Sequence, residues 1–146
     1  MFSKILVPFD GSRNAEEALR KAAGLARLTG GEIVILTVWR HHSLLEASFS
    51  MARPEAMPGS LDEVLRDEAR AVAEHGKQIA REAGAPHLRA FVKSGPPART
   101  IVKWAEEKGA DLIVLGSRGV GSVESFLLGS VSHKVTGMAR CPVLVV

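Results

Sequence analysis

Residues 116–130 read Gly116-Ser-Arg-Gly-Val-Gly-Ser-Val-Glu-Ser-Phe-Leu-Leu-Gly-Ser130, which has the pattern G-x2-G-x9-G-S. The stretch directly follows an apolar run at residues 112–115 and precedes a segment whose apolar residues have helical spacing. A glycine-rich loop between a strand and a helix exposes backbone N–H groups, and such loops bind phosphate groups. The pattern therefore favours a nucleotide-holding loop over an ordinary flexible loop.

Strand-like apolar runs alternate with helix-like segments along the whole chain. The runs lie at residues 5–7, 33–39, 88–93, 111–115 and 142–146. This alternation predicts one domain over residues 1–146, an α/β Rossmann-like sandwich with a five-stranded parallel sheet and helices on both faces.

Two loops carry residues suited to a binding site, one after the first strand and one after the fourth. Ligands in such sheets bind beyond the carboxyl ends of the strands, where the strand order reverses. The two loops can share a ligand only if the first and fourth strands are neighbours. This condition predicts the strand order 3-2-1-4-5, with the fifth strand on an edge.

The connection from Arg40 to Gly59 has no clear periodicity, and a connection of this length is often a lid or a binding segment. The next helix is expected to begin after Ser60, with Glu63 three residues later completing a capping box.

Composition excludes several classes of function. Tyr is absent and aromatic residues are 5% of the chain, which argues against a surface that stacks nucleic-acid bases, although the net charge is +3. The one cysteine, Cys141, excludes an intrachain disulfide. No apolar run approaches the ~20 residues of a membrane span, and no leader is recognised, so we expect a cytoplasmic protein without membrane insertion.

The glycine-rich stretch itself supplies most of the candidate binding residues. Gly116 and Gly119 let the backbone turn and approach a ligand closely. Gly129 opens the last helix, and the following N–H groups, including that of Val131, point toward a phosphate. Ser130 either donates to the phosphate or acts as the helix N-cap, and both roles are compatible. Arg118 either reaches a phosphate or is solvated.

Asp10 follows the first strand, and Val38 lies at the end of the second. The Asp10 carboxylate either accepts hydrogen bonds from an amino group or a ribose hydroxyl, or caps the first helix, and the spacing does not choose between them. Val38 either lines a base pocket or is ordinary core.

The residues quoted above resemble the universal stress protein family, in its ATP-binding branch, over the whole chain. Residues 5–12 read Ile5-Leu-Val-Pro-Phe-Asp-Gly-Ser12 and resemble the family's first strand and loop. Residues 111–119 and 129–132 resemble its ATP loop with both spacings intact, and residues 141–146 resemble its closing strand.

The resemblance implies an adenine nucleotide, ATP or its AMP and ADP relatives, with Mg²⁺ accompanying it. It implies that Pro8, Asp10 and Val38 surround adenine and ribose. It also implies that Gly116, Arg118 and Gly119 lie along the ribose and α-phosphate, and that Gly129, Ser130 and Val131 hold the outer phosphates.

The resemblance also implies partners. Family members commonly form homodimers through the last strand, here from Val143 to Val146. Further assembly of dimers into a tetramer is an alternative. That strand would be an exposed apolar edge in a monomer, so pairing is also favoured on physical grounds. Residues 41–55 are similar to those of family members associated with TRAP-type transporters, which implies a membrane-transporter partner; a lid or a dimer contact are the alternatives.

The expected function is a dimeric, nucleotide-dependent regulatory switch in the stress response. The alternative is a slow ATPase built on the same site. Hydrolysis needs a base positioned for water, and the nearest candidate is Glu124, which is otherwise a solvated loop residue. No residue is assigned as catalytic or as a metal ligand.

Overall fold

A computed structural model describes residues 1–40, 58–119 and 128–146 of the chain, with residues 58–60 described in their backbone only. Its strands are β1 (Lys4–Pro8), β2 (Glu32–Trp39), β3 (His87–Ser94), β4 (Leu112–Leu115) and β5 (Val143–Val145). They form one parallel sheet of order β3-β2-β1-β4-β5, which confirms the predicted topology. The order reverses between β1 and β4.

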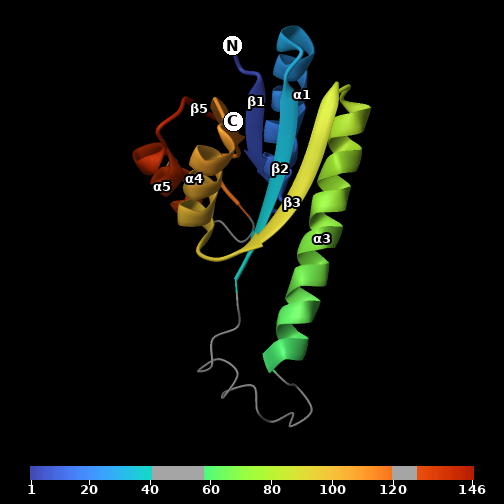
Figure 1. Cartoon of the computed structure of the whole chain (residues 1–146), viewed down its shortest axis with the longest axis vertical. Coiled ribbons are helices and arrows are strands. Elements are labelled where there is room, and N and C mark those ends of the chain that lie inside the picture. Colours follow the sequence, from blue (N-terminus) through green and yellow to red (C-terminus); the bar gives the residue numbers. More distant parts are fainter. Residues whose placement is uncertain (41–57, 120–127) are drawn as a thin grey trace.

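Helices cover both faces of the sheet (Figure 1). Helices α1 (Arg13–Thr29) and α3 (Pro58–Glu82) lie on one face, and α4 (Pro97–Lys108) and α5 (Ser130–Met138) lie on the other. In β1, Ile5 and Val7 point toward the α1 side while Leu6 points toward the α4 side. All three are fully buried, which explains why β1 reads as a continuous apolar run.

Burial falls toward the edges of the sheet. All four residues of β4 are buried, whereas β3 alternates between half-buried and exposed residues. The outer strand β5 leaves Leu144 39% exposed. The central strands β1 and β4 therefore give the site a rigid support.

The ends of the helices follow local chemistry. Ser12 caps α1, its Oγ accepting from the Ala15 N–H at 3.2 Å, and Gly30 ends the helix with a left-handed φ of 74°. Helix α3 begins at Pro58, so the capping box predicted at Ser60 is wrong. Proline suits the first turn of a helix because its fixed φ is helical and it has no N–H to leave unpaired.

Candidate functional site

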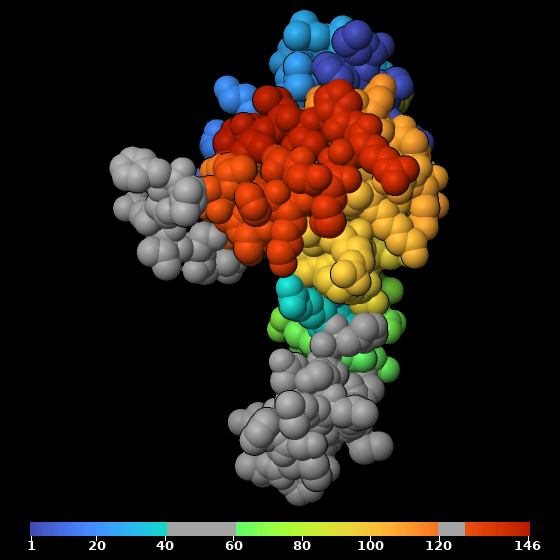
Figure 2. All heavy atoms as spheres, turned by 90° about the vertical axis from the view of Figure 1, so that its left-hand side faces the viewer, coloured from blue at the N-terminus to red at the C-terminus, as the bar shows by residue number. Residues whose placement is uncertain are grey.

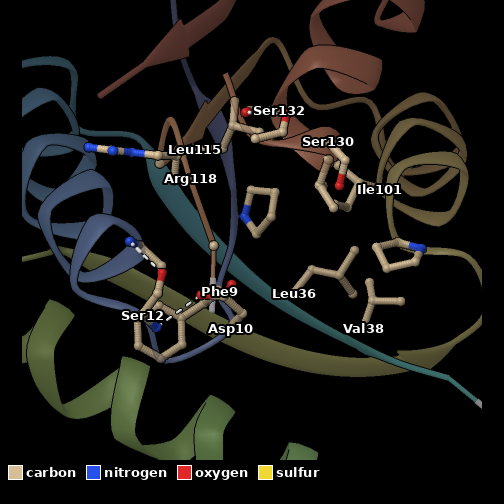
Figure 3. Close-up of a pocket in the computed structure, with 17 residues that line it drawn as sticks. Phe9, Asp10, Ser12, Leu36, Val38, Ile101, Leu115, Arg118, Ser130 and Ser132 are labelled. Atoms are coloured by element: carbon tan, nitrogen blue, oxygen red, sulfur yellow. Dashed lines mark hydrogen bonds between the residues drawn. The ribbon is translucent and has the colours of Figure 1, made fainter. Parts of the chain in front are cut away.

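A cavity of about 200 Å³ opens at the carboxyl ends of β1 and β4, where the strand order reverses (Figure 3). It lies where the fold predicts a ligand site. Its lining includes every site residue predicted from the sequence: Pro8, Asp10, Val38, Gly116, Arg118, Gly119, Gly129, Ser130 and Val131. The structure thus brings these residues together from β1, β2, the loop after β4 and the start of α5.

The apolar part of the cavity contains residues that the sequence prediction missed. Leu36 lies two residues before Val38 on the same face of β2, and Ile101 comes from α4. Phe9, which is 2% exposed, and Leu115 add to this surface. The strand period of two starting from Val38 would have identified Leu36.

Hydrogen bonds hold the turn after β1 on both sides of Asp10. The Asp10 Oδ1 accepts from the Ser12 N–H at 2.9 Å. The Thr37 hydroxyl, which is buried, donates to the Phe9 carbonyl at 2.8 Å. Since Ser12 is the N-cap of α1, the alternative that Asp10 caps this helix is wrong. Asp10 instead lies at the cavity, and the hydrogen bonds of Phe9 and Ser12 hold the backbone before and after it.

The glycines after β4 allow close approach of the backbone to its neighbours. A Cβ at Gly116 would lie 2.7 Å from Asn14 Cβ and 2.8 Å from the Asn14 carbonyl carbon. A Cβ at Gly119 would lie 2.6 Å from Asp10 Oδ2. Neither glycine has a left-handed φ, so the expected tight turn is not what requires them. Gly116 permits close packing against α1, and Gly119 permits close approach to the Asp10 carboxylate.

The first turn of α5 faces the same cavity. Its N-cap is Gly129, which has no side chain to accept hydrogen bonds from the first N–H groups. The alternative that Ser130 is the N-cap is therefore wrong, because Ser130 is the first helical residue. An anion at this position would satisfy the first-turn N–H groups and interact favourably with the helix dipole.

Ser132 joins the two ends of the glycine-rich stretch. Its hydroxyl is within hydrogen-bonding distance of the Ser117 carbonyl at 2.7 Å and of the Gly129 carbonyl at 3.0 Å. The Ser117 carbonyl also accepts from the Gly129 N–H at 2.7 Å. Ser132 is 3% exposed, and its part-buried contacts fix the start of α5 against the loop.

Three further residues have roles at the cavity that differ, or lie outside the described part. The Arg118 side chain extends away from the cavity toward α1, although the residue lines it (Figure 3). His133, near the start of α5, is exposed and does not line the cavity. Glu124, the candidate base for hydrolysis, lies outside the described residues.

Cys141 packs beside the core on the α4 side, and burial raises the pKa of its thiol, as expected for a packing residue. Within residues 1–40, 58–119 and 128–146, no group of three or more His, Cys, Asp or Glu residues has the arrangement of a metal site. The helices of this described part include none long and apolar enough to cross a membrane.

The fold and the cavity define a doubly wound α/β protein with an anion-attracting helix start at its switch point. The model of the Universal stress protein family matches residues 1–146, and the chain belongs to this family. The chain is 37% identical to the universal stress protein YxiE of Bacillus subtilis, with 100% of this chain and 99% of that protein covered.

Solved structures show the same architecture. The chain is similar to MJ0577 of Methanocaldococcus jannaschii, with a TM-score of 0.81, 32% identity, and coverage of 100% of this chain and 96% of that one. A universal stress protein in complex with cAMP matches with a TM-score of 0.71 and 25% identity, over 99% of this chain and 96% of that one. The universal stress protein from Archaeoglobus fulgidus in complex with dAMP matches with a TM-score of 0.70 and 25% identity, over 99% and 98%.

Proposed function

We propose that this protein binds an adenine nucleotide in the cavity between β1 and β4 and acts as a nucleotide-dependent regulatory switch. The observation that carries the proposal is one cavity that combines the Asp10 carboxylate, an apolar surface and the start of α5 without a side-chain cap. The complexes of two relatives with cAMP and dAMP support the choice of adenine.

The chemistry of the lining suggests how the nucleotide would lie. The base would pack against Leu36, Val38 and Ile101, which remove apolar ring surface from water. Asp10 would accept hydrogen bonds from the base amino group or the ribose hydroxyls. The phosphates would lie against the glycine-rich loop and the N–H groups that follow Gly129.

In this proposal Mg²⁺ enters with the phosphates of ATP. Divalent magnesium is commonly held by substrate phosphates and water with few protein ligands. AMP and ADP would keep the contacts to base, ribose and α-phosphate. These nucleotides are therefore expected to share the site with ATP.

Hydrolysis would need a general base among the acidic groups of the cavity. Asp10 is the one acidic residue that lines the described cavity, and its Oδ1 already accepts from the Ser12 N–H. A general base for water must lie within hydrogen-bonding reach of the attacking water. Retention of intact ATP by the protein over hours would support the switch, whereas steady phosphate release would support the slow ATPase.

The first experiment is to identify any nucleotide that copurifies and then to titrate stripped protein with AMP, ATP and GTP, with and without Mg²⁺. We expect binding of AMP and ATP and much weaker binding of GTP. The Asp10→Asn variant should lose roughly 10-fold or more in AMP affinity, since a charged acceptor is replaced by a neutral one. Asp67→Asn is the matched control, because Asp67 is exposed on α3 and does not line the cavity.

No adenine nucleotide bound by the stripped protein, or equal AMP affinity in Asp10→Asn, would contradict the proposal. Gly129→Val is a poor test because its Cβ would also press on Arg118 Cα at 3.2 Å and the Ser117 oxygen at 3.3 Å.

We also propose a homodimer in which the outer edge of β5 pairs with a second copy. Leu144 is 39% exposed on this edge strand, and an unpaired apolar edge tends to associate. Leu144→Lys should shift the mass measured by light scattering toward the monomer, whereas an unchanged mass would contradict the dimer. Assembly into a tetramer, a transporter partner at residues 41–55 and a cytoplasmic location remain predictions, and residues 41–57 lie outside the described part.

A further inference from the structure

A second hollow, of about 370 Å³, lies beside the nucleotide cavity on the α4 and α5 side of the sheet. We call it the basic hollow, after its cations Arg40, Arg99 and Lys134. Its other lining residues are Pro96, Pro97, Ala98, Ser130, Val131 and Met138. Figure 2 shows this face, where the end of β2 (cyan), the start of α4 (yellow) and α5 (red) meet.

The two hollows share a wall. Pro97, Ser130 and Val131 line both the nucleotide cavity and the basic hollow. The residues that begin α5 therefore separate two adjacent spaces, one of which is proposed to hold a nucleotide. A group in the basic hollow would contact the same turn of α5 that faces the nucleotide phosphates.

The charge of the basic hollow is not balanced by the described protein. None of its lining residues is acidic. Elsewhere on the surface some cations have a carboxylate neighbour, as in Arg89 with Glu32 at 2.7 Å and Arg140 with Glu106 at 3.3 Å. Among the described residues, Arg40, Arg99 and Lys134 take part in no such ion pair. Three like charges around one hollow repel one another, and an anion placed among them removes that repulsion.

The backbone adds to the positive potential. Pro96 is the N-cap of α4 and Gly129 is the N-cap of α5, and neither makes a side-chain cap hydrogen bond. Residues of both first turns, Ala98 and Arg99 in α4 and Ser130 and Val131 in α5, line the hollow. The helix dipoles therefore favour negative charge at the same place as the cations.

We propose that the basic hollow binds a multivalent phosphate group, directly beside the nucleotide cavity. Arginine matches phosphate with a planar fork of donors, and lysine acts as a point charge, so the three cations suit two or more phosphate units. The group has two possible sources, the outer phosphates of the nucleotide itself or a separate phosphorylated molecule. In the first case the inference rests on the proposed function, and in the second it stands without it.

The test compares two double variants with the same change of charge. Arg99→Gln/Lys134→Gln removes two cations of the hollow. Lys21→Gln/Arg81→Gln removes two exposed cations from α1 and α3, on the opposite face of the sheet. All four side chains belong to exposed residues, so both variants should fold, which their thermal unfolding checks.

Isothermal titration with sodium tripolyphosphate alone is the first measurement. We expect the wild type and the Lys21→Gln/Arg81→Gln control to bind it with affinities within about threefold of each other. We expect Arg99→Gln/Lys134→Gln to bind it at least about 10-fold more weakly, because charge-assisted hydrogen bonds are lost. No binding to the wild type, or equal weakening in both double variants, would overturn the proposal.

Nucleotide titrations then distinguish the two sources. If the outer phosphates enter the hollow, Arg99→Gln/Lys134→Gln weakens ATP about 10-fold while AMP stays within about twofold, and ATP-saturated protein no longer binds tripolyphosphate. If the ligand is separate, AMP and ATP affinities are unchanged and tripolyphosphate binds to ATP-saturated protein. Failure of AMP to bind the wild type would refute the proposed function, whereas tripolyphosphate binding that depends on Arg99 and Lys134 would still support the hollow.

Discussion

The two sides of the cavity between β1 and β4 are built by different means. On the β1 side, side chains fix the backbone: the Thr37 hydroxyl donates to the Phe9 carbonyl, and the Asp10 carboxylate accepts from the Ser12 N–H. On the β4 side the lack of a side chain lets Gly116 pack directly against Asn14, and the Ser132 hydroxyl holds the start of α5 against the loop. One side thus offers a carboxylate, and the other offers backbone and a helix start.

This difference describes the ligand that fits. A carboxylate accepts hydrogen bonds and repels anions, whereas a helix start attracts them. The complementary molecule has hydrogen-bond donors at one end and negative charge at the other, as a nucleoside phosphate does. Four substitutions test whether the two sides of the cavity act independently of each other.

Gly116→Ala should have the largest effect on stability. Its methyl group would lie 2.7 Å from Asn14 Cβ and 2.8 Å from the Asn14 carbonyl carbon, and this contact with backbone leaves little room to relax. We expect a loss of about 1–3 kcal/mol in the free energy of unfolding, measured by urea denaturation. Gly24→Ala is the matched control: a Cβ there meets nothing within 4 Å, so helix propensity should raise stability by about 0.5–1 kcal/mol. An unchanged free energy of unfolding in Gly116→Ala would contradict the view that close packing requires glycine at this position.

Thr37→Val should affect the β1 side. The valine keeps the volume but removes the donor to the buried Phe9 carbonyl, which we expect to cost about 1–2 kcal/mol of unfolding free energy. Because the same contact fixes the turn before Asp10, affinities for adenosine and AMP should fall together. Thr37→Ser, which retains the hydroxyl, should restore most of the affinity. A variant that weakens AMP alone would show that this side senses phosphate.

Ser132→Ala should affect the β4 side. The Ser117 carbonyl keeps its bond from the Gly129 N–H, so the loss of stability should be smaller, about 0.5–1.5 kcal/mol. The start of α5 would be held less firmly against the loop. Titration should therefore show weaker AMP binding with adenosine binding unchanged. Equal losses for the two ligands would mean that the sides are coupled and that the comparison fails.

The sequence was sufficient to predict the strand order and part of the cavity lining, but it missed apolar lining residues such as Leu36 and Ile101. Continuous apolar runs such as residues 5–7 required cover on both faces, and the two polar loops required β1 and β4 to be neighbours. The roles within the site were harder to predict. Glycine is required at position 116 because the backbone there packs against Asn14. The N-cap of α5 is Gly129 rather than Ser130. The first role depends on a residue about a hundred positions away in the sequence, and the second depends on which residue begins the helix. The spacing of residues within the glycine-rich stretch shows neither.

The smallest effect is expected at the opposite end of β4, where Asp111 is remote from the cavity. Its carboxylate accepts from the Ser3 N–H at 2.9 Å and from the Lys4 N–H at 3.1 Å. Burial disfavours the charged form, but these hydrogen bonds outweigh it, and the pKa of Asp111 is lowered. A pKa below that of the unfolded chain, about 3.9, means that the ionised carboxylate stabilises the fold above that pH. This contribution is lost as the pH falls through the folded pKa.

Asp111→Asn should therefore destabilise the protein slightly at pH 7, and the difference from wild type should shrink as the pH falls below about 4. Urea unfolding at pH 7, 4 and 2.5 measures it. A pH-independent difference would mean that the hydrogen bonds do not depend on the charge of Asp111. AMP affinity at pH 7 should be unchanged, because Asp111 does not line the cavity. A loss of affinity would mean that β4 transmits a change from its amino end to the glycine-rich loop, and the β4 side would then be less rigid than its packing against Asn14 implies.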